Sequence, residues 1–244
     1  MRILHISDLH VPSTRSLTQV WGPVEACLRL EDRFDFVVVS GDLSERAQPA
    51  EFEALEELIT EDVMRWLPDD DRSRIIFVPG NHDVLWDDAH FNPVLAGHDT
   101  VAAAESVRRD PHRSNYRSEV TKLGELRLWE IKQPEHSARL GNVQAFFDKF
   151  YGGSLAAKPQ KKLMLLAPGE DWSCHAFLDQ GIAFIGLNSC HRNDKYWHGA
   201  GFDPQAINAA SRHVYKLRQQ KPNLLVVAVW HHGFASDSAR PDRL

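Results

Sequence analysis

The sequence has few cysteines and no long apolar run. Its three cysteines, Cys27, Cys174 and Cys190, are far apart and odd in number. That pattern does not fit a disulfide framework and favours a reducing compartment. The apolar run after Met1 is too short for a signal peptide, and no run of about 18 apolar residues is present to cross a membrane. We therefore expect a cytoplasmic protein with no membrane partner.

Positive charge is also scarce. Lysine and arginine number 28 against 34 acidic residues, which gives a net charge of −6. This balance argues against an overall basic nucleic-acid binder, although a metal centre could still attract phosphate locally. The 43% hydrophobic and 25% charged shares are those of an ordinary globular protein, and 244 residues suffice for one core. The charge therefore leaves the substrate open, and the length predicts a single domain, 1–244.

Short apolar runs rich in β-branched residues predict buried strands. They cover residues 3–6, 36–39, 75–78, 182–187 and 224–229. Apolar residues at helical spacing predict helices over 51–67 and from Asp203-Pro204 to Leu217, and a further helix over 143–151 ends at Gly152-Gly153. Strands that alternate with helices indicate a layered α/β fold.

The stretch from about 84 to 172 interrupts this alternation. It is polar, with scattered histidines and the helix over 143–151. We interpret it as an insertion over the functional site and not as a separate domain.

Polar side chains that bind hard metal ions follow four of the predicted strands. The segments are Ser7-Asp8-Leu9-His10, Ser40-Gly41-Asp42, Gly80-Asn81-His82-Asp83 and His231-His232-Gly233. Loops at the carboxyl ends of strands in an open α/β sheet line one crevice, so we expect these side chains to converge. Either His231 or His232 could serve as the ligand, and we favour His231.

Oxygen and imidazole ligands without thiolates suit Mn, Fe, Zn or related ions that are held for chemistry. Two such ions about 3.5–4 Å apart clamp a phosphoryl group and lower the pKa of a bridging water. Asp42 is well suited to bridge them. The sequence thus predicts hydrolysis of a phosphodiester or phosphomonoester by a metal-bridged hydroxide.

These motifs, in this order, resemble the calcineurin-like metallophosphoesterase family. The resemblance rests on Asp8-x-His10, Gly41-Asp42 and Gly80-Asn81-His82-Asp83, and it implies an α-β-β-α sandwich with two divalent metal ions. It assigns Asp8 and His10 to the first metal, Asp42 to the bridge, and Asn81 and His231 to the second metal. It also implies that His82 steadies the transition state or protonates the leaving oxygen, with Asp83 orienting the imidazole.

The sequence departs from the family after Gly233, where the family would carry a Gly-His-x-His motif. We expect a chain that stops short of its final strands, binds metal weakly and self-associates, with further domains possible beyond Leu244.

The segments around Asp8 and Asp42 look more like the cyclic-nucleotide phosphodiesterase branch than the protein phosphatases. A DNA or RNA nuclease effector within a larger protein remains an alternative, as does a catalytically weak scaffold module. The predicted partner is a phosphate-ester substrate, and a nucleotide or nucleic acid is a candidate for it. Trp86 and Trp197 are candidates for the lining of its pocket.

Overall fold

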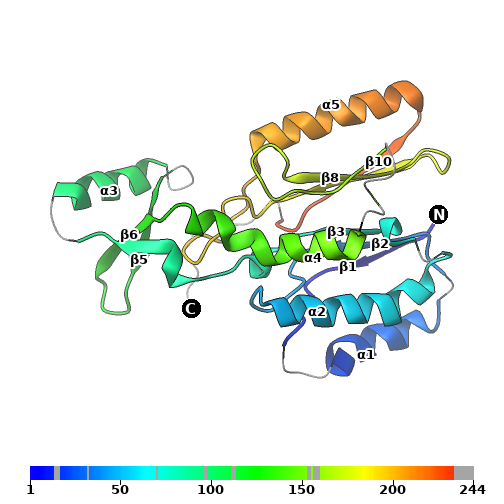
Figure 1. Cartoon of the computed structure of the whole chain (residues 1–244), viewed down its shortest axis with the longest axis horizontal. Coiled ribbons are helices and arrows are strands. Elements are labelled where there is room, and N and C mark those ends of the chain that lie inside the picture. The colour runs from blue at the N-terminus through cyan, green and yellow to red at the C-terminus, as the bar shows by residue number, and fades with distance from the viewer. Residues whose placement is uncertain are drawn as a thin grey trace.

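The computed structural model describes residues 1–13, 17–31, 33–69, 71–95, 98–110, 114–152, 155 and 160–233. Their main elements form four layers, with α5 (Pro204–Gln220) outside one sheet and α1 (Leu17–Leu28) and α2 (Pro49–Leu58) outside the other (Figure 1). The predicted layered α/β fold is confirmed. No helix in the described ranges is long and apolar enough to span a bilayer.

The first sheet is parallel, in the order β1 (Ile3–Ile6), β2 (Phe36–Ser40), β3 (Ile75–Val78). Every residue of β2 and β3 is buried, as expected for parallel strands that are covered on both faces. The helix after β2 continues past α2 as a π-helix, Ile59–Val63, and a 3-10 helix, Met64–Trp66. At its start, Glu51 accepts hydrogen bonds from the main-chain N–H groups of Arg46 and Gln48.

The second sheet is mixed, in the order β10 (Leu225–Val229), β9 (Ile182–Leu187), β8 (Trp172–Phe177), β7 (Lys161–Lys162). Only the β10–β9 pair is parallel. Alternate side chains of β9 face opposite layers. Phe184 packs 5.0 Å from Phe36 of the first sheet, between the ring centroids, whereas Ile185 joins the apolar cluster under α5. Both faces of this sheet therefore contribute to the core.

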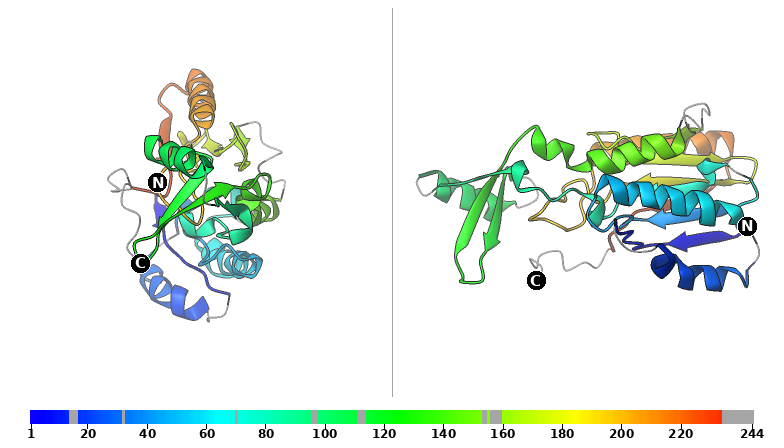
Figure 2. Two further views of the ribbon diagram at one scale, coloured as in Figure 1. Left: turned by 90° about the vertical axis from the view of Figure 1, so that its left-hand side faces the viewer. Right: turned by 60° about the horizontal axis from the view of Figure 1, so that its bottom comes forward.

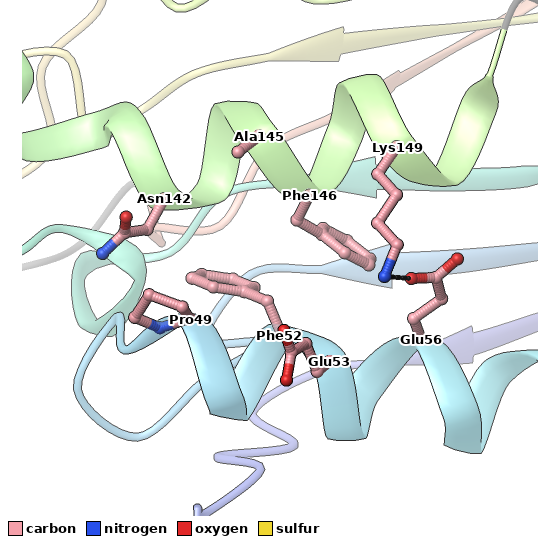
Figure 3. Close-up of a pocket in the computed structure, with 8 residues that line it drawn as sticks. All are labelled: Pro49, Phe52, Glu53, Glu56, Asn142, Ala145, Phe146 and Lys149. Carbon is pink, nitrogen blue, oxygen red and sulfur yellow. Dashed lines mark ion pairs between the residues drawn. The ribbon is translucent and has the colours of Figure 1, made fainter.

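We expected the stretch 84–172 to be one insertion. In the structure, part of it belongs to the main core and part forms a separate small sheet. Its helix α4 (Gly141–Tyr151) packs beside α2 and belongs to the main core, and it ends at Gly152 with φ of 44°. Phe52 and Phe146 stack with centroids 5.6 Å apart, and Lys149 pairs with Glu56 at 2.8 Å at the edge of this contact (Figure 3). The buried aromatic residues of α4 lie in two pairs one helical turn apart, Phe146-Phe147 and Phe150-Tyr151, which explains why this helix packs in the core.

Strands between residues 91 and 131 of that stretch form a small third sheet at one end of the layers (Figures 1 and 2). Its antiparallel strands follow the order β4 (Phe91–Pro93), β6 (Leu126–Ile131), β5 (Tyr116–Val120), and α3 (His98–Arg109) lies beside them. Short 3-10 turns at Asp88–His90 and Glu135–Leu140 flank the sheet. We refer to β4, α3, β5 and β6 as the side subdomain.

All five predicted strands are present, within one residue at each end. The helices predicted over 51–67, 143–151 and from Asp203 are also present, and the Asp203 side chain accepts a hydrogen bond from Gln205 as the cap of α5. Residues 234–244, where we expected the chain to stop short of its final strands, lie outside the described residues.

Candidate metal centre

The loops after β1, β2 and β3 meet at the carboxyl ends of these strands. The main-chain N–H of Asp8 donates to the carbonyl of Gly41 at 3.2 Å, and that of His10 donates to the carbonyl of Asp42 at 2.9 Å. The N–H of His82 donates to Oδ1 of Asp42 at 2.9 Å. The three motifs predicted from the sequence are thus joined into one structure around Asp42.

Three of the predicted ligands have left-handed backbone conformations. The φ angles are 56° at Asp8, 44° at His10 and 49° at Asp42. Such a conformation costs a non-glycine residue on the order of 1 kcal/mol or more, and strained residues of this kind cluster at functional sites. Holding these three side chains in place therefore lowers the stability of the fold.

Two glycines leave room for the ligands. A Cβ atom at Gly41, where φ is 86°, would lie 2.5 Å from the His231 ring. A Cβ atom at Gly80 would lie 2.1 Å from both the main-chain nitrogen and Oδ1 of Asp42. A side chain at either position would displace a candidate ligand.

The buried Asp42 carboxylate lies between two histidines. Its Oδ2 is 3.6 Å from Nε2 of His10, and its Oδ1 is 3.4 Å from Nε2 of His231. Burial alone would raise the pKa of Asp42, but the hydrogen bond and charge of His231 and the N–H of His82 outweigh it, so the pKa lies below its usual value. Asp42 is thus an anion that presents one oxygen to each side.

Main-chain carbonyls orient two of the histidines. Nδ1 of His231 lies 2.9 Å from the Ser40 carbonyl, and Nδ1 of His82 lies 2.9 Å from the Glu45 carbonyl. Because a carbonyl can only accept, Nδ1 carries the proton in both rings, and in His231 Nε2 faces Asp42. Burial alone would lower the pKa of His231, but the Asp42 carboxylate and the Ser40 carbonyl outweigh burial and raise this pKa to about 9. The same negative charge would favour a metal cation at Nε2.

Two groups of ligand atoms share Asp42. One consists of His10, Asp42 and His82, the other of Asp8, Asp42 and His231, and within each the atoms lie within 4.8 Å of one another. The resemblance instead paired Asp8 with His10. Asn81, at the start of the 3-10 turn Asn81–Asp83 after β3, is half-buried. The structure therefore brings most of the predicted ligands together, with a different division between the two groups.

Asp83 does not take the role that we expected. Its buried carboxylate accepts hydrogen bonds from the main-chain N–H groups of Leu43, Ser44 and Gly80 and from the Ser44 hydroxyl, at 2.8 to 3.1 Å. Desolvation raises its pKa to about 6, against the effect of these donors. The His82 ring is oriented by the Glu45 carbonyl, so the expectation that Asp83 orients it is corrected. Asp83 instead holds the loop that carries Asp42.

His232, the alternative to His231, has both ring nitrogens occupied. Its Nε2 lies 2.9 Å from the His198 carbonyl, and its Nδ1 lies 2.9 Å from the Ser189 hydroxyl. His231 is therefore the better ligand of the two, as expected.

A third group, Asp171, His191 and Asp203, lies outside this centre. Asp203 accepts hydrogen bonds from the N–H groups of Gln205 and Gly169, and His191 pairs with Asp171 through a short hydrogen bond. These contacts cap α5 and connect the loop after β9 to Asp171, the residue before β8.

Aromatic rings adjoin the centre. Trp86 lies 5.5 Å from the His82 ring and stacks on His198 at 4.3 Å, between centroids. Trp86 was a candidate pocket residue from the sequence, but nothing in the sequence pointed to His198. The Ser40 and Glu45 carbonyls were also missed, because main-chain groups leave no residue-type signal.

A sequence model of the family described as calcineurin-like phosphoesterase matches residues 1–238. No curated protein matches the chain.

Proposed function

The chain belongs to the calcineurin-like phosphoesterase family, and we propose that it hydrolyses a phosphodiester or phosphomonoester at a centre of two divalent cations. The observation that carries this proposal is the position of Asp42. Its two oxygens face His10 and His231 at 3.6 and 3.4 Å. A buried anion shared by two ligand groups is the arrangement that a bridging ligand requires.

The donor set fits divalent cations. Carboxylate oxygens and imidazole nitrogens suit Mn, Fe or Zn. The three candidate ligands with positive φ and the glycines that make room for Asp42 and His231 also fit a site built to hold ions closely. Asp8, His10, Asp42, Asn81 and His231 would hold the two ions, and we propose Mn as one that supports activity.

When bound, the cations would polarise the phosphoryl group and lower the pKa of the attacking water. The protein's own contribution is to place charge and a proton donor. Asp42 fixes the spacing between the two ligand groups. His82 belongs to the ligand group of His10 and Asp42, and the Glu45 carbonyl holds its ring through Nδ1, which leaves Nε2 for the substrate. A proton on that Nε2 could be donated to a phosphoryl or leaving-group oxygen.

The test compares hydrolysis of bis-p-nitrophenyl phosphate, p-nitrophenyl phosphate, cyclic nucleotides and single-stranded DNA with added Mn²⁺ and with EDTA. We expect at least one ester to be cleaved, with the rate abolished by EDTA and restored by Mn²⁺. The assay uses the 244-residue chain.

Single-stranded DNA as the best substrate would favour the nuclease alternative within the same chemistry. Absence of hydrolysis of all four kinds of ester, with folded protein and bound metal, would refute the proposal and favour a scaffold module.

A further inference from the structure

A row of aromatic rings leads outward from the metal centre. The His10 and His82 rings meet edge to face with centroids 4.5 Å apart, and Trp86 follows His82 at 5.5 Å. His198 then stacks on Trp86 at 4.3 Å with the two planes only 5° apart. The indole thus lies one histidine ring away from the candidate ligands.

Trp86 is unusually exposed for a large aromatic residue beside a polar site. It is 40% exposed, although His198 covers one of its faces. Exposed tryptophan surface is unfavourable in water, and tryptophan prefers to bury its ring against another flat group. The remaining exposed surface is therefore available to a planar ligand.

The position of His198 is fixed from the metal-centre side. Its carbonyl accepts a hydrogen bond from Nε2 of His232, the neighbour of the candidate ligand His231. Nδ1 of His232 is hydrogen-bonded in turn to the Ser189 hydroxyl, in the loop after β9. The stacked pair therefore has a fixed relation to the centre.

The loop that carries His198 is also held by the side subdomain. Asp194 pairs with Arg117 of β5 at 2.8 Å and with His136 at 3.1 Å, and all three side chains are buried. Tyr196 stacks on Trp129 of β6 with centroids 5.6 Å apart. The side subdomain thus supports one member of the stacked pair instead of standing apart from the site.

We propose that Trp86 and His198 form a stacking platform for the base of a nucleotide-containing phosphoester whose phosphate group lies at the metal centre. This inference rests on the proposed function and narrows its substrate class. A nucleotide joins its phosphate to a flat aromatic base through one sugar, which matches a polar centre with an aromatic platform one ring away. Stacking of a base on an aromatic side chain contributes about 1–3 kcal/mol and tolerates any base.

The test uses two diesters that differ only in the base. One is adenosine 5′-(methyl phosphate), and the other is the same ester with hydrogen in place of adenine. We measure the ratio of kcat/KM for the two in the wild type, Trp86→Phe and Trp86→Ala. The ratio should favour the adenine ester in the wild type, fall about tenfold in Trp86→Ala and recover largely in Trp86→Phe, because phenylalanine keeps a flat ring. Tyr215→Ala is the matched control, since Tyr215 is an exposed aromatic residue on α5, and it should leave the ratio unchanged.

A second readout does not depend on turnover. Equilibrium dialysis should show adenosine 5′-monophosphate bound about tenfold more weakly by Trp86→Ala than by the wild type. An unchanged ratio and unchanged binding in a folded Trp86→Ala protein would overturn the platform while leaving hydrolysis in place. Failure of the wild type to cleave any of the two diesters, bis-p-nitrophenyl phosphate and p-nitrophenyl phosphate would overturn the proposed function itself.

Discussion

Gly80 lies so close to Asp42 that a Cβ atom at Gly80 would be 2.1 Å from Oδ1 of the Asp42 carboxylate. No real Cβ atom tolerates such a contact, and the Asp42 main-chain nitrogen is equally close. The glycine of the Gly80-Asn81-His82-Asp83 motif is therefore required by the position of Asp42.

Replacement of Gly80 tests this contact. Gly80→Ala should displace Asp42 and reduce phosphoesterase turnover by at least about 100-fold, because a shift of about 1 Å in a catalytic group can reduce the rate by that factor. The measurement is the rate per folded chain, with folding checked by circular dichroism. Gly141→Ala, at the start of α4 with open space around the glycine, is the control and should leave the rate unchanged. A fully active Gly80→Ala protein would contradict the geometry.

His82 is proposed to act on the phosphoryl group, although it also belongs to one of the two groups of candidate metal ligands. His82→Ala should keep both metal ions and lower turnover by about 100- to 10,000-fold, as loss of a proton donor does. Metal content per chain, measured by mass spectrometry, separates this role from ligation. Loss of one metal with an unchanged rate per remaining centre would make His82 a ligand instead.

Asp83 should act through the loop that it holds and not through the acidity of His82. Asp83→Asn faces an amide toward N–H donors that need an acceptor, and we expect a loss of about 2–3 kcal/mol in the free energy of unfolding. Urea denaturation gives this value. The pH–rate profile of the remaining activity should keep its shape, whereas a shifted acidic or basic limb would restore Asp83 as the partner of His82.

His175 should make the fold sensitive to acid. Its buried ring donates from Nδ1 to the Ser73 carbonyl at 2.9 Å, and burial lowers its pKa to about 4. Histidine in the unfolded chain has a pKa near 6.5, so the unfolded state takes up the proton first and stability falls as the pH drops from about 6.5 toward 4.

The predicted loss from this one group is about 2 kcal/mol between pH 7 and pH 5. His175→Asn, which keeps a donor for the Ser73 carbonyl, should flatten the pH dependence of urea unfolding by that amount even if it lowers stability at pH 7. An equally steep dependence in the variant would show that His175 titrates normally in the fold.

The strands that carry the site could be predicted from the sequence because parallel buried strands are continuously apolar. The β2 residues Phe36–Ser40 are all buried, and their run of valines is unmistakable. The side subdomain could not be predicted in the same way. In β5 and β6 the exposed residues outnumber the buried ones, and one of the buried residues is Arg117, so no apolar run marks either strand.

Two further elements, β8 and α1, could not be predicted from the sequence because of particular residues within them. In β8, Ser173 and His175 are buried among apolar residues, which masks the apolar pattern of the strand. In α1, Gly22 and Pro23 lie inside the helix and read as breakers.

Part of the site could likewise be predicted from the sequence, and part could not. Side chains that follow strands were predictable, because the topology brings strand ends together. The roles of the Ser40 and Glu45 carbonyls depend on the path of the backbone and not on residue type. The error over Asp83 has a related cause, since a neighbour in sequence need not face the same space. Asp83 points back toward the loop of Leu43 and Ser44.

The most direct test of the central claim is a Mn²⁺ titration of metal-stripped protein, with bound metal and diester hydrolysis followed together in the wild type and in Asp42→Asn. If Asp42 is shared by two cations, wild-type activity should saturate at two Mn²⁺ per chain. Asp42→Asn should bind far more weakly and lose most of its activity, because a neutral amide holds dications poorly. Asp42→Asn activity within about threefold of the wild type, a barrier difference under about 1 kcal/mol, or saturation at a single ion would contradict it.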